Sequence, residues 1–600
     1  MTPFGRIPGE IERLLAEAAG TPSRRAFLQG SGLFAVSLLA TPLGERTAAA
    51  QTAGPYPPVD FRKLDTWIVI HQDSTATFYV GKTDGGQGTG TAFRQLMCDE
   101  LDLDYDKSTL IMGRTDTTPD QGGSGGSDAL QVDAYPARRV AAEARRVLLD
   151  LASTKLGVPV AQLTAASGVI RVTADPGRKA TYGELIGGRR FNVTLTGANI
   201  NATTGLATLK PAGALTITGQ PIPRYDIPGK VDGTVKWASG VQVPGMVHAR
   251  NVRPPTAGAT FVSYDEASVA RLPGFIQVVQ RGNYVAVVCE REEQAVAAAR
   301  AIKVTWTKAA TPPFPPSDDL YRYMRQATPT VDNPPAVQGN PDGALASAAK
   351  TLTASYDWPF QGHTAIGPAH ALADWSNGQL TIYSNDMKSY GLRTGVAKFL
   401  DLPEDTVRVV WMDGPQVYGR TAADDAGFEA AFLAKTLGRP VRVQWMRHEE
   451  TAWDAKGPAY TVDVKGGLDA EGHLVALDWA SRAADHAHLG YNEPDTVLIA
   501  QLMGTRRKPA SGMAAAPSEL YEVPHRRRRT QVVGMPLVFE SPLRTGNLRD
   551  PNGPQVTFAG ESFIDELAAA AGADPVAFRL TLLTASTKED AAFRRARSIA

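Results

Sequence analysis

Glycine-rich loops are the residues of this 600-residue chain that point most directly to chemistry. One covers residues 85–90, a second covers 119–127, and a third, rich in Gly, Pro and Arg, covers 544–554. Glycine lets backbone N–H groups approach a ligand closely, and a helix that follows the loop adds a dipole that favours anions. Together these loops predict one large, phosphate-bearing cofactor held by distant segments. Plain turns are the alternative.

The loops and the cysteines exclude several familiar cofactor sites. No loop has the Gly-Lys-Ser/Thr of a P-loop, and none matches the dinucleotide fingerprint between a strand and a helix. Cys98 and Cys289 are the only cysteines. Two cysteines form no disulfide framework and cannot supply the four thiolates of an iron–sulfur cluster. A redox cofactor would therefore be bound without protein sulfur, or its clusters would belong to another subunit.

The N-terminal residues have the pattern of a targeting signal. Arg24-Arg25 precedes a short apolar run, 32–43, and a small-residue string follows at 48–50. The apolar run is shorter than the roughly 20 residues needed to span a bilayer. It resembles a twin-arginine signal peptide, which exports folded proteins, and an ordinary secretory signal is the alternative. We therefore expect a leader over 1–50 and a periplasmic protein that collects its cofactor before export.

The charge of the chain argues against nucleic acid as a partner. It has 62 basic and 62 acidic residues, so no overall positive field attracts a polyanion. The arginine run 526–529 is the one basic block, and no aromatic residues interleave it. We expect this run to be a solvated loop.

Hydrophobic patterning predicts a mixture of helices and strands without a fixed repeat. The first two glycine-rich loops each lead into a predicted helix. A stretch rich in Pro, Asp and Asn, 311–345, reads as a linker. The predicted strands are 66–70, 75–80, 380–383, 407–411 and 441–446, and the predicted helices are 92–101, 136–155, 292–302, 424–437 and 559–571.

Further motifs stand in a characteristic order from residue 224 onward. They occupy residues 224–234 with 243–250, then 361–368, then 412–420 with 423–426, and finally 548–555 with 558–567. In this order they resemble the hammerhead start, the glutamine loop, the glycine–aromatic–glycine loop and the arginine loop of one family. That family is the molybdenum-binding large subunit of the xanthine dehydrogenase/aldehyde oxidase type. The closest resemblance is to its isoquinoline 1-oxidoreductase and nicotinate dehydrogenase branch.

The order of segments supports this branch. Loops 86–88 and 122–127 resemble segments that lie late in xanthine dehydrogenase itself, but here they precede the hammerhead motif. The resemblance implies an α+β, multidomain molybdopterin-binding subunit with an α/β hammerhead domain and permuted segment order. Its implied parts are the leader 1–50, a molybdopterin-binding segment 51–222, the hammerhead 223–310, a linker 311–348 and a second molybdopterin-binding domain 349–600.

The resemblance also implies the cofactor and the partners. In such enzymes molybdenum is held by the dithiolene sulfurs of a pterin, in bacteria often as a cytosine dinucleotide, and the protein supplies no metal ligand. Oxygen from water is added to an N-heteroaromatic or aldehyde substrate, with a glutamate as the base. Electrons then leave through a small subunit with two [2Fe–2S] clusters and a c-type cytochrome.

Residue by residue, the resemblance assigns a candidate site. Arg549 would stabilise negative charge on the substrate, with Arg544 as a second candidate. Pairing with Asp550 is the alternative role of Arg549, local backbone bonding that of Gln361, and core packing that of Tyr418. The implied cofactor contacts are Gln361 at the apical oxo ligand, Tyr418 and Gly419 beside the metal, Gly86, Gln87 and Gly88 in a pterin-binding loop, Gly126 and Ser127 near the molybdenum centre, and Arg544.

Departures from the family keep a second function open. Gly367 stands where many relatives carry glutamate, and 415–417 is bulkier than the family's glycine run. The catalytic Gly-Glu loop does not occur before residue 600, so we expect it beyond; Glu561 and Glu566 fit an ordinary helix. A non-catalytic cofactor-binding paralogue or carrier is the alternative to an enzyme. A quinoprotein dehydrogenase would need repeats of roughly 40–50 residues, which are absent.

Overall fold

The computed structural model describes residues 54–308, 315–414, 423–485, 494, 496–504, 514–516, 521–535, 543–546, 548 and 552–583. All of them belong to one unit, residues 53–600. Over this described part, helices and strands are mixed, and the strands form separate sheets with separate apolar cores. The predicted α+β, multidomain fold class is confirmed. None of the described helices is both long and apolar enough to cross a membrane.

A seven-stranded sheet combines the predicted hammerhead region with residues more than a hundred positions later. β18 pairs in parallel with β7, and every residue of strand β10 is buried. Helix α12, rich in alanine, packs closely on β15 and β18. In spatial order the strands are β17 (Val407–Trp411), β16 (Gln379–Ser384), β15 (His370–Ser376), β18 (Val441–Gln444), β7 (Val247–Asn251), β10 (Tyr284–Cys289) and β9 (Phe275–Arg281), with α8 (Glu292–Ala301), α11 (Ser389–Phe399), α12 (Ala423–Leu437) and α14 (Leu498–Met503) packed on them.

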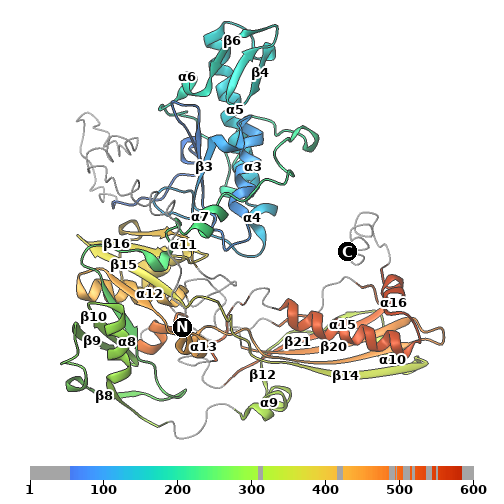
Figure 1. The fold of residues 1–600 in the computed structure, drawn as a ribbon. Helices are drawn as coiled ribbons and strands as arrows, with labels where there is room; N and C mark the ends of the chain where they lie inside the picture. The colour runs from blue at the N-terminus through green and yellow to red at the C-terminus, as the bar shows by residue number, and fades with distance from the viewer. Residues whose placement is uncertain are drawn as a thin grey trace, which may run out of the picture. The chain divides into compact units, whose positions relative to one another are not determined.

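A second, six-stranded sheet lies under helix α15 (Figure 1). The bare Cα of Gly466 on β19 lets Phe563 and Leu567 of α15 come close, since a Cβ there would be 3.0 Å from each. The helix begins at Gly553, earlier than predicted, because Pro554 suits a first helical turn. The elements are β12 (Pro329–Asp332), β13 (Ala336–Gln338), β14 (Lys350–Trp358), β19 (Tyr460–Leu468), β20 (Leu474–Ala484) and β21 (His525–Val533), with α9 (Leu320–Gln326), α10 (Pro341–Ser347), α15 (Gly553–Ala570) and α16 (Pro575–Thr581).

Two expectations need correction in this sheet. The arginine run 526–529 is not a loop but the first half of β21, where Arg527 pairs with Asp478 and Asp342 and Arg529 pairs with Asp332. Residues 315–348 are not a bare linker, because β12 and β13 pair with β21. The prolines of this stretch suggested a linker, but they stand where regular structure tolerates proline. Pro329 is the first residue of an edge strand, and Pro341 lies in the first turn of a helix.

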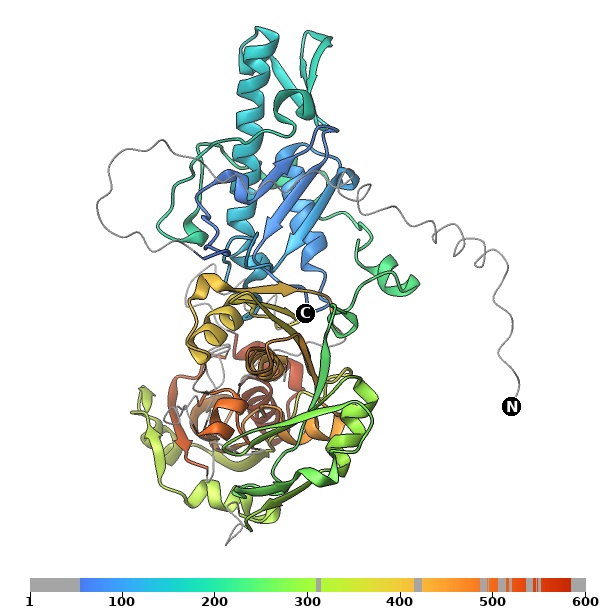
Figure 2. The same cartoon turned by 90° about the vertical axis from the view of Figure 1, so that its left-hand side faces the viewer.

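Residues 54–222 build a three-stranded sheet with long helices against it (Figures 1 and 2). Gly88 at the N-cap of α3 has a φ of +84°, and this left-handed residue starts the helix at Thr89, three residues before the predicted start. The elements are β1 (Ile68–Ile70), β2 (Ala76–Val80), α3 (Thr89–Leu101), β3 (Ser108–Met112), α4 (Asp128–Gln131), α5 (Ala134–Leu156), β4 (Leu163–Ala166), β5 (Val169–Val172), β6 (Asp175–Thr181) and α6 (Tyr182–Ile186); α7 (Ile227–Asp232), β8 (Phe261–Asp265) and β11 (Lys303–Trp306) follow.

Two chain connections run side by side between the two large sheets. The first, 359–369, leads from β14 to β15, and the second, 445–459, leads from β18 through α13 (Arg447–Trp453) to β19. They are antiparallel because β14 pairs with β19 and β15 pairs with β18 in antiparallel register. The predicted glutamine loop therefore lies in a connection between the two large sheets, and the strands at both ends of this connection are held in a sheet.

Candidate functional site

Gln361 and Gly457 are hydrogen-bonded to each other across the two connections. The N–H of Gly457 donates to the carbonyl of Gln361 at 2.8 Å, and the N–H of Gln361 donates to the carbonyl of Gly457 at 3.3 Å. The side chain of Gln361 lies over the bare Cα of Gly457. This pairing holds the first predicted cofactor residue in place.

A third segment joins this pair from the other side. The N–H of Lys456 donates to the carbonyl of Arg544, and the N–H of Gly546 donates to the carbonyl of Lys456, both at 2.8 Å. Leu548 also reaches Gly457, where a Cβ would be 3.1 Å from its Cδ2. The glutamine and arginine loops, remote in sequence, therefore meet at residues 456–457. Arg549, the next residue, lies outside the described part of the chain.

Arg544 is fully buried in an ion pair with Asp425. Its Nη2 lies 2.5 Å from Asp425 Oδ2, and its Nη1 donates to the carbonyl of Thr496 at 3.0 Å. Only 1% of the residue is exposed. A guanidinium committed in this way is poorly placed to reach a substrate, so the geometry favours an anchoring role over the predicted second substrate contact. A cofactor contact of Arg544 stays a prediction.

The buried carboxylate of Asp454 anchors the glutamine loop. Asp454 accepts the N–H of His363 at 3.2 Å and forms an ion pair with Lys456. The imidazole Nδ1 of His363 is 3.6 Å from Asp454, too far for a hydrogen bond. Burial alone would raise the pKa of Asp454, but its neighbours His363 and Lys456 together lower this pKa. For His363 and Lys456 themselves, burial is the largest effect and lowers the pKa of each.

A second buried carboxylate, Glu450 on α13, is linked to the same loop through Arg447. Glu450 is 3% exposed and pairs with Arg447 at 2.9 Å, and Arg447 also donates to the carbonyl of Ile366 at 2.5 Å. Burial raises the pKa of Glu450 to about 7, despite the opposing charge of Arg447. This group therefore changes charge near neutral pH.

The first glycine-rich loop is capped by its own carboxylate. Asp84 accepts the N–H groups of Gly86 at 2.8 Å, Gly88 at 3.2 Å and Gly90 at 3.0 Å. These amides were expected to face an anion, and Asp84 already occupies that position. Gln87 is exposed, and its side chain has no hydrogen bond to any described residue. The loop thus offers a cofactor Gln87 rather than these amides.

The second loop packs against residues that precede α11. Lys82 donates to the carbonyl of Gly123 at 2.6 Å and is paired with Asp133. The N–H of Ser124 donates to the carbonyl of Met387 at 2.8 Å, and a Cβ on Gly123 would be 2.3 Å from that same oxygen. Only glycine fits there. Gly126 and Ser127, both exposed and left-handed, follow directly.

An ion-pair chain connects the first loop to the end of β17. Arg224 donates to the carbonyl of Gly86 at 2.5 Å and pairs with Asp226, and Lys230 bridges Asp226 at 2.6 Å and Asp413 at 2.8 Å. Burial would raise the pKa of Asp226, but its two cationic partners lower it to about 2. Asp413 belongs to the glycine–aromatic–glycine loop, of which Tyr418 and Gly419 lie outside the described residues.

The described residues fit a metal that arrives with its own ligands. Among them, the only His/Cys/Asp/Glu group able to hold a metal is the exposed hairpin turn Asp469, Glu471 and His473, at the far end of β19 from Gly457. Donors for an organic cofactor are present: Gln87 is exposed, and Ser389, at the start of α11 beside Met387, is wholly buried with no partner for its hydroxyl in the described part.

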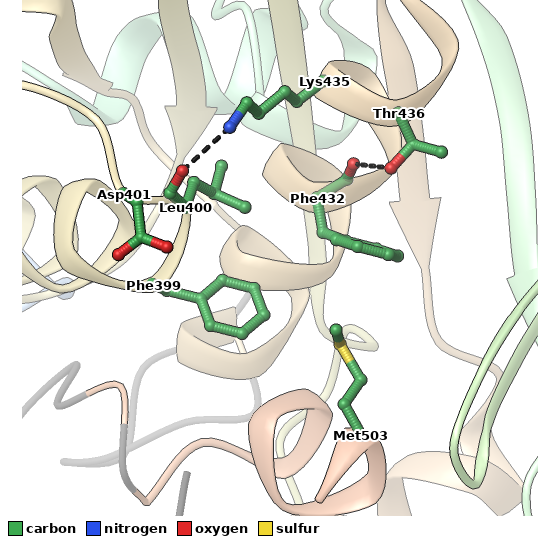
Figure 3. A pocket seen from close by; sticks show the side chains of 7 residues that line it. All are labelled: Phe399, Leu400, Asp401, Phe432, Lys435, Thr436 and Met503. Carbon is green, nitrogen blue, oxygen red and sulfur yellow. Dashed lines mark hydrogen bonds between the residues drawn. The ribbon is translucent and has the colours of Figure 1, made fainter. Parts of the chain in front are cut away.

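A surface pocket of about 430 Å³ lies apart from these residues (Figure 3). It is formed where α11, α12 and α14 end, and Lys435 uses its ammonium to bind the carbonyl of Leu400 at 2.8 Å. Thr436 bonds Phe432 within its own helix. The pocket contains none of the predicted site residues and lacks converging polar groups that would orient a ligand.

Sequence reasoning missed the residues that assemble the site. Gly457, Lys456 and Asp454 had no motif of their own, and Asp425 was noted only as part of a loop. The separation in sequence is 91 residues for Asp454 and His363, and 119 for Asp425 and Arg544. An acidic residue directly before a glycine-rich loop, as Asp84 is, was the one local signal available.

Comparison with known proteins identifies two domains of the chain. Two models of the molybdopterin cofactor-binding domain match, over residues 45–218 and 326–582. A nicotinate dehydrogenase subunit of Pseudomonas putida is 34% identical over 94% of this chain and 46% of its own length. The membrane-bound aldehyde dehydrogenase [pyrroloquinoline-quinone] of Gluconacetobacter polyoxogenes is 26% identical over 86% of this chain and 66% of its own.

A third relative and one solved structure are also similar to this chain. The beta subunit of isoquinoline 1-oxidoreductase from Brevundimonas diminuta is 26% identical over 95% of this chain and 76% of its own length. Quinoline 2-oxidoreductase from Pseudomonas putida 86 has a TM-score of 0.49 at 17% identity, over 62% of this chain and 50% of its own. This chain spans about half the length of the nicotinate dehydrogenase subunit from Pseudomonas putida. The two domain matches show that residues 45–218 and 326–582 are molybdopterin cofactor-binding domains, and the relatives similar to the chain include subunits of nicotinate dehydrogenase and isoquinoline 1-oxidoreductase.

Proposed function

We propose that this chain is the catalytic molybdenum subunit of a hydroxylase that oxidises an N-heteroaromatic or aldehyde substrate. One observation supports this most: the glutamine loop and the arginine loop, separated by more than 180 residues, are hydrogen-bonded to the same dipeptide, Lys456-Gly457. A cofactor residue and a substrate residue must lie close together if chemistry is to occur between their ligands. The relatives' names, nicotinate dehydrogenase and isoquinoline 1-oxidoreductase, support the substrate class.

The bound molybdenum–pterin group supplies the redox chemistry, namely transfer of two electrons from the substrate and delivery of a water-derived oxygen. The protein binds and orients. Gln361 presents an amide to the metal end of the cofactor, and Gln87 presents one to the pterin. Arg549 stabilises negative charge that develops on the substrate. Ser127 and Gly126 offer backbone N–H groups from an exposed loop.

The partners and location form part of the same proposal. Electrons leave through a small subunit with two [2Fe–2S] clusters and then a c-type cytochrome. The pterin carries a cytosine dinucleotide, and the twin-arginine leader over 1–50 places the protein in the periplasm. The paucity of cysteine supports clusters on another chain, since two thiols cannot ligate one.

Turnover separates this proposal from its alternative, a non-catalytic cofactor-binding paralogue or carrier. The full-length protein, purified with its small subunit, is mixed with nicotinate, isoquinoline and aromatic aldehydes, an electron acceptor and ¹⁸O-labelled water. Acceptor reduction with label in the product supports the hydroxylase. Stoichiometric molybdenum without turnover on any substrate, together with transfer of the cofactor to a cofactor-free relative, supports the carrier.

A further inference from the structure

The side chain of Gln361 lies against a residue that has no side chain. A Cβ built on Gly457 would stand 2.9 Å from Gln361 Cγ and 3.1 Å from its amide nitrogen, Nε2. Non-bonded carbon atoms pack at about 3.5–4.0 Å, so both distances are too short for a methyl group. The amide of Gln361 can hold its present position only while residue 457 is glycine.

Backbone geometry does not explain the glycine. The φ angle of Gly457 lies outside the left-handed region, so an alanine would adopt this backbone without strain. What the position requires is space. Leu548 closes the other flank, where the same Cβ would be 3.1 Å from its Cδ2.

The backbone of residue 457 cannot retreat to make that space. It is hydrogen-bonded to Gln361 in both directions, and its neighbour Lys456 is hydrogen-bonded to Arg544 and Gly546 on the opposite side. Lys456 is also held by its buried ion pair with Asp454. The segment is fixed on both flanks, so an added methyl would have to displace the side chains that face it.

From this geometry we infer that Gly457 is a positioning residue, which sets the direction of the Gln361 amide toward the bound cofactor by leaving room for it. Gly457 acts through contact and contributes no group of its own. The inference rests on the proposed function, in which the Gln361 amide meets the metal end of the cofactor.

The test compares Gly457→Ala with Gly213→Ala in the full-length holoprotein with its small subunit. Gly213 is exposed, has no atom within 4 Å of a built Cβ and has no left-handed φ, so it is a matched control. A displacement of roughly 1 Å in a reacting group can cost about 100-fold in rate. We expect Gly457→Ala to lower kcat by about 10- to 100-fold, with KM, melting temperature and molybdenum content close to those of Gly213→Ala.

A double-mutant cycle shows whether the effect passes through Gln361. In a Gln361→Ala background the side chain to be displaced is gone, so Gly457→Ala should lower kcat no further. An additive loss would overturn the inference, since it would mean a general structural defect. Hydrogen–deuterium exchange provides a readout apart from activity: faster exchange of the peptide 359–366 is expected in Gly457→Ala and not in Gly213→Ala.

The outcomes also separate this inference from the proposed function. A wild-type protein without molybdenum or turnover would refute the proposed function, and the inference would fall with it. A molybdenum-loaded Gly457→Ala protein with wild-type kcat and unchanged exchange would refute the inference alone. Loss of kcat that disappears in the Gln361→Ala background supports both.

Discussion

Arg544 and Asp425 form a buried ion pair, with Nη2 2.5 Å from Oδ2, although they are 119 residues apart in sequence. Their side chains are 1% and 4% exposed. Asp425 also accepts the N–H of Leu498 at 2.7 Å. The pair joins the start of α12, just after the glycine–aromatic–glycine loop, to the arginine loop, so these two parts of the site are held in one arrangement.

Removing the charge of Arg544 should strongly destabilise the fold. Arg544→Met leaves Asp425 buried without its partner, which typically costs about 3–5 kcal/mol in the free energy of unfolding. Arg544→Lys should recover little, because one ammonium cannot match the planar fork that reaches Asp425 and the carbonyl of Thr496. Urea denaturation measures both. Arg529→Met, which breaks an exposed pair with Asp332, is the control, and an equal loss there would contradict the account.

Neighbouring glycines of the second loop should differ sharply when replaced by alanine. Gly122 and Gly123 have φ angles of +69° and +70°, so alanine strains the backbone equally at both. At Gly122 a Cβ has no atom within 4 Å, whereas at Gly123 it would be 2.3 Å from the carbonyl oxygen of Met387.

Thermal unfolding should therefore show a larger loss for Gly123→Ala, by a further 1–3 kcal/mol, roughly the cost of overpacking. Cofactor retention should also fall, since the contact between Ser124 and Met387 would open. Equal melting temperatures for the two variants would show that this close approach is unimportant.

The first loop should separate stability from cofactor binding. Asp84→Ala removes the acceptor of three backbone amides and should lower the free energy of unfolding by about 2 kcal/mol, the scale of charged hydrogen bonds. Gln87→Ala should leave stability unchanged, because its exposed side chain bonds no described residue, but should lower molybdenum and pterin content. If Gln87→Ala retained full cofactor content, Gln87 would not be a pterin contact.

Glu450 should make stability fall as pH rises toward neutrality. Its ordinary pKa of 4.5 is raised to about 7 by burial, so between these values the folded state binds a proton that the unfolded state has released. The contribution of Glu450 to the free energy of unfolding therefore decreases from pH 4.5 to pH 7, by about 3 kcal/mol at 1.36 kcal/mol per pKa unit. Above pH 7 this contribution stays constant.

Glu450→Gln should abolish this contribution, so the variant should be more stable than the wild type at pH 8 and little changed at pH 4.5. Denaturant unfolding at several pH values tests this. The exposed Glu293→Gln on α8 is the control. Parallel pH profiles for wild type and Glu450→Gln would contradict the account.

The sequence predicted single elements better than their assembly. Strand 407–411 matches β17, because its valines and tryptophan are a local signal for a strand. The pairing of β7 with β18 could not be read, since no local pattern tells a strand which distant strand it will join. The arginine run 526–529 was misread because charge suggested solvent, whereas acidic residues on neighbouring segments, such as Asp478, neutralise it within a sheet.

The site shows the same division. Gln361 was singled out by its motif, but its neighbour Gly457 was not, because a glycine that is required only for the space next to it has no signature in sequence. For the first loop the sequence was misleading: the loop was interpreted as a site for an anionic ligand, but the carboxylate of Asp84, directly before the loop, binds its amides. The predicted roles of Gly86, Gln87, Gly88, Gly126, Ser127, Gln361, Tyr418, Gly419, Arg544 and Arg549 stay predictions.

Cofactor content of the full-length protein tests the central claim most directly. The protein is purified with any co-purifying small subunit from a host that makes the cofactor, and its metal and its acid-released nucleotide are measured. The account predicts stoichiometric molybdenum and cytidine monophosphate. Protein that is folded but contains no molybdenum would contradict it.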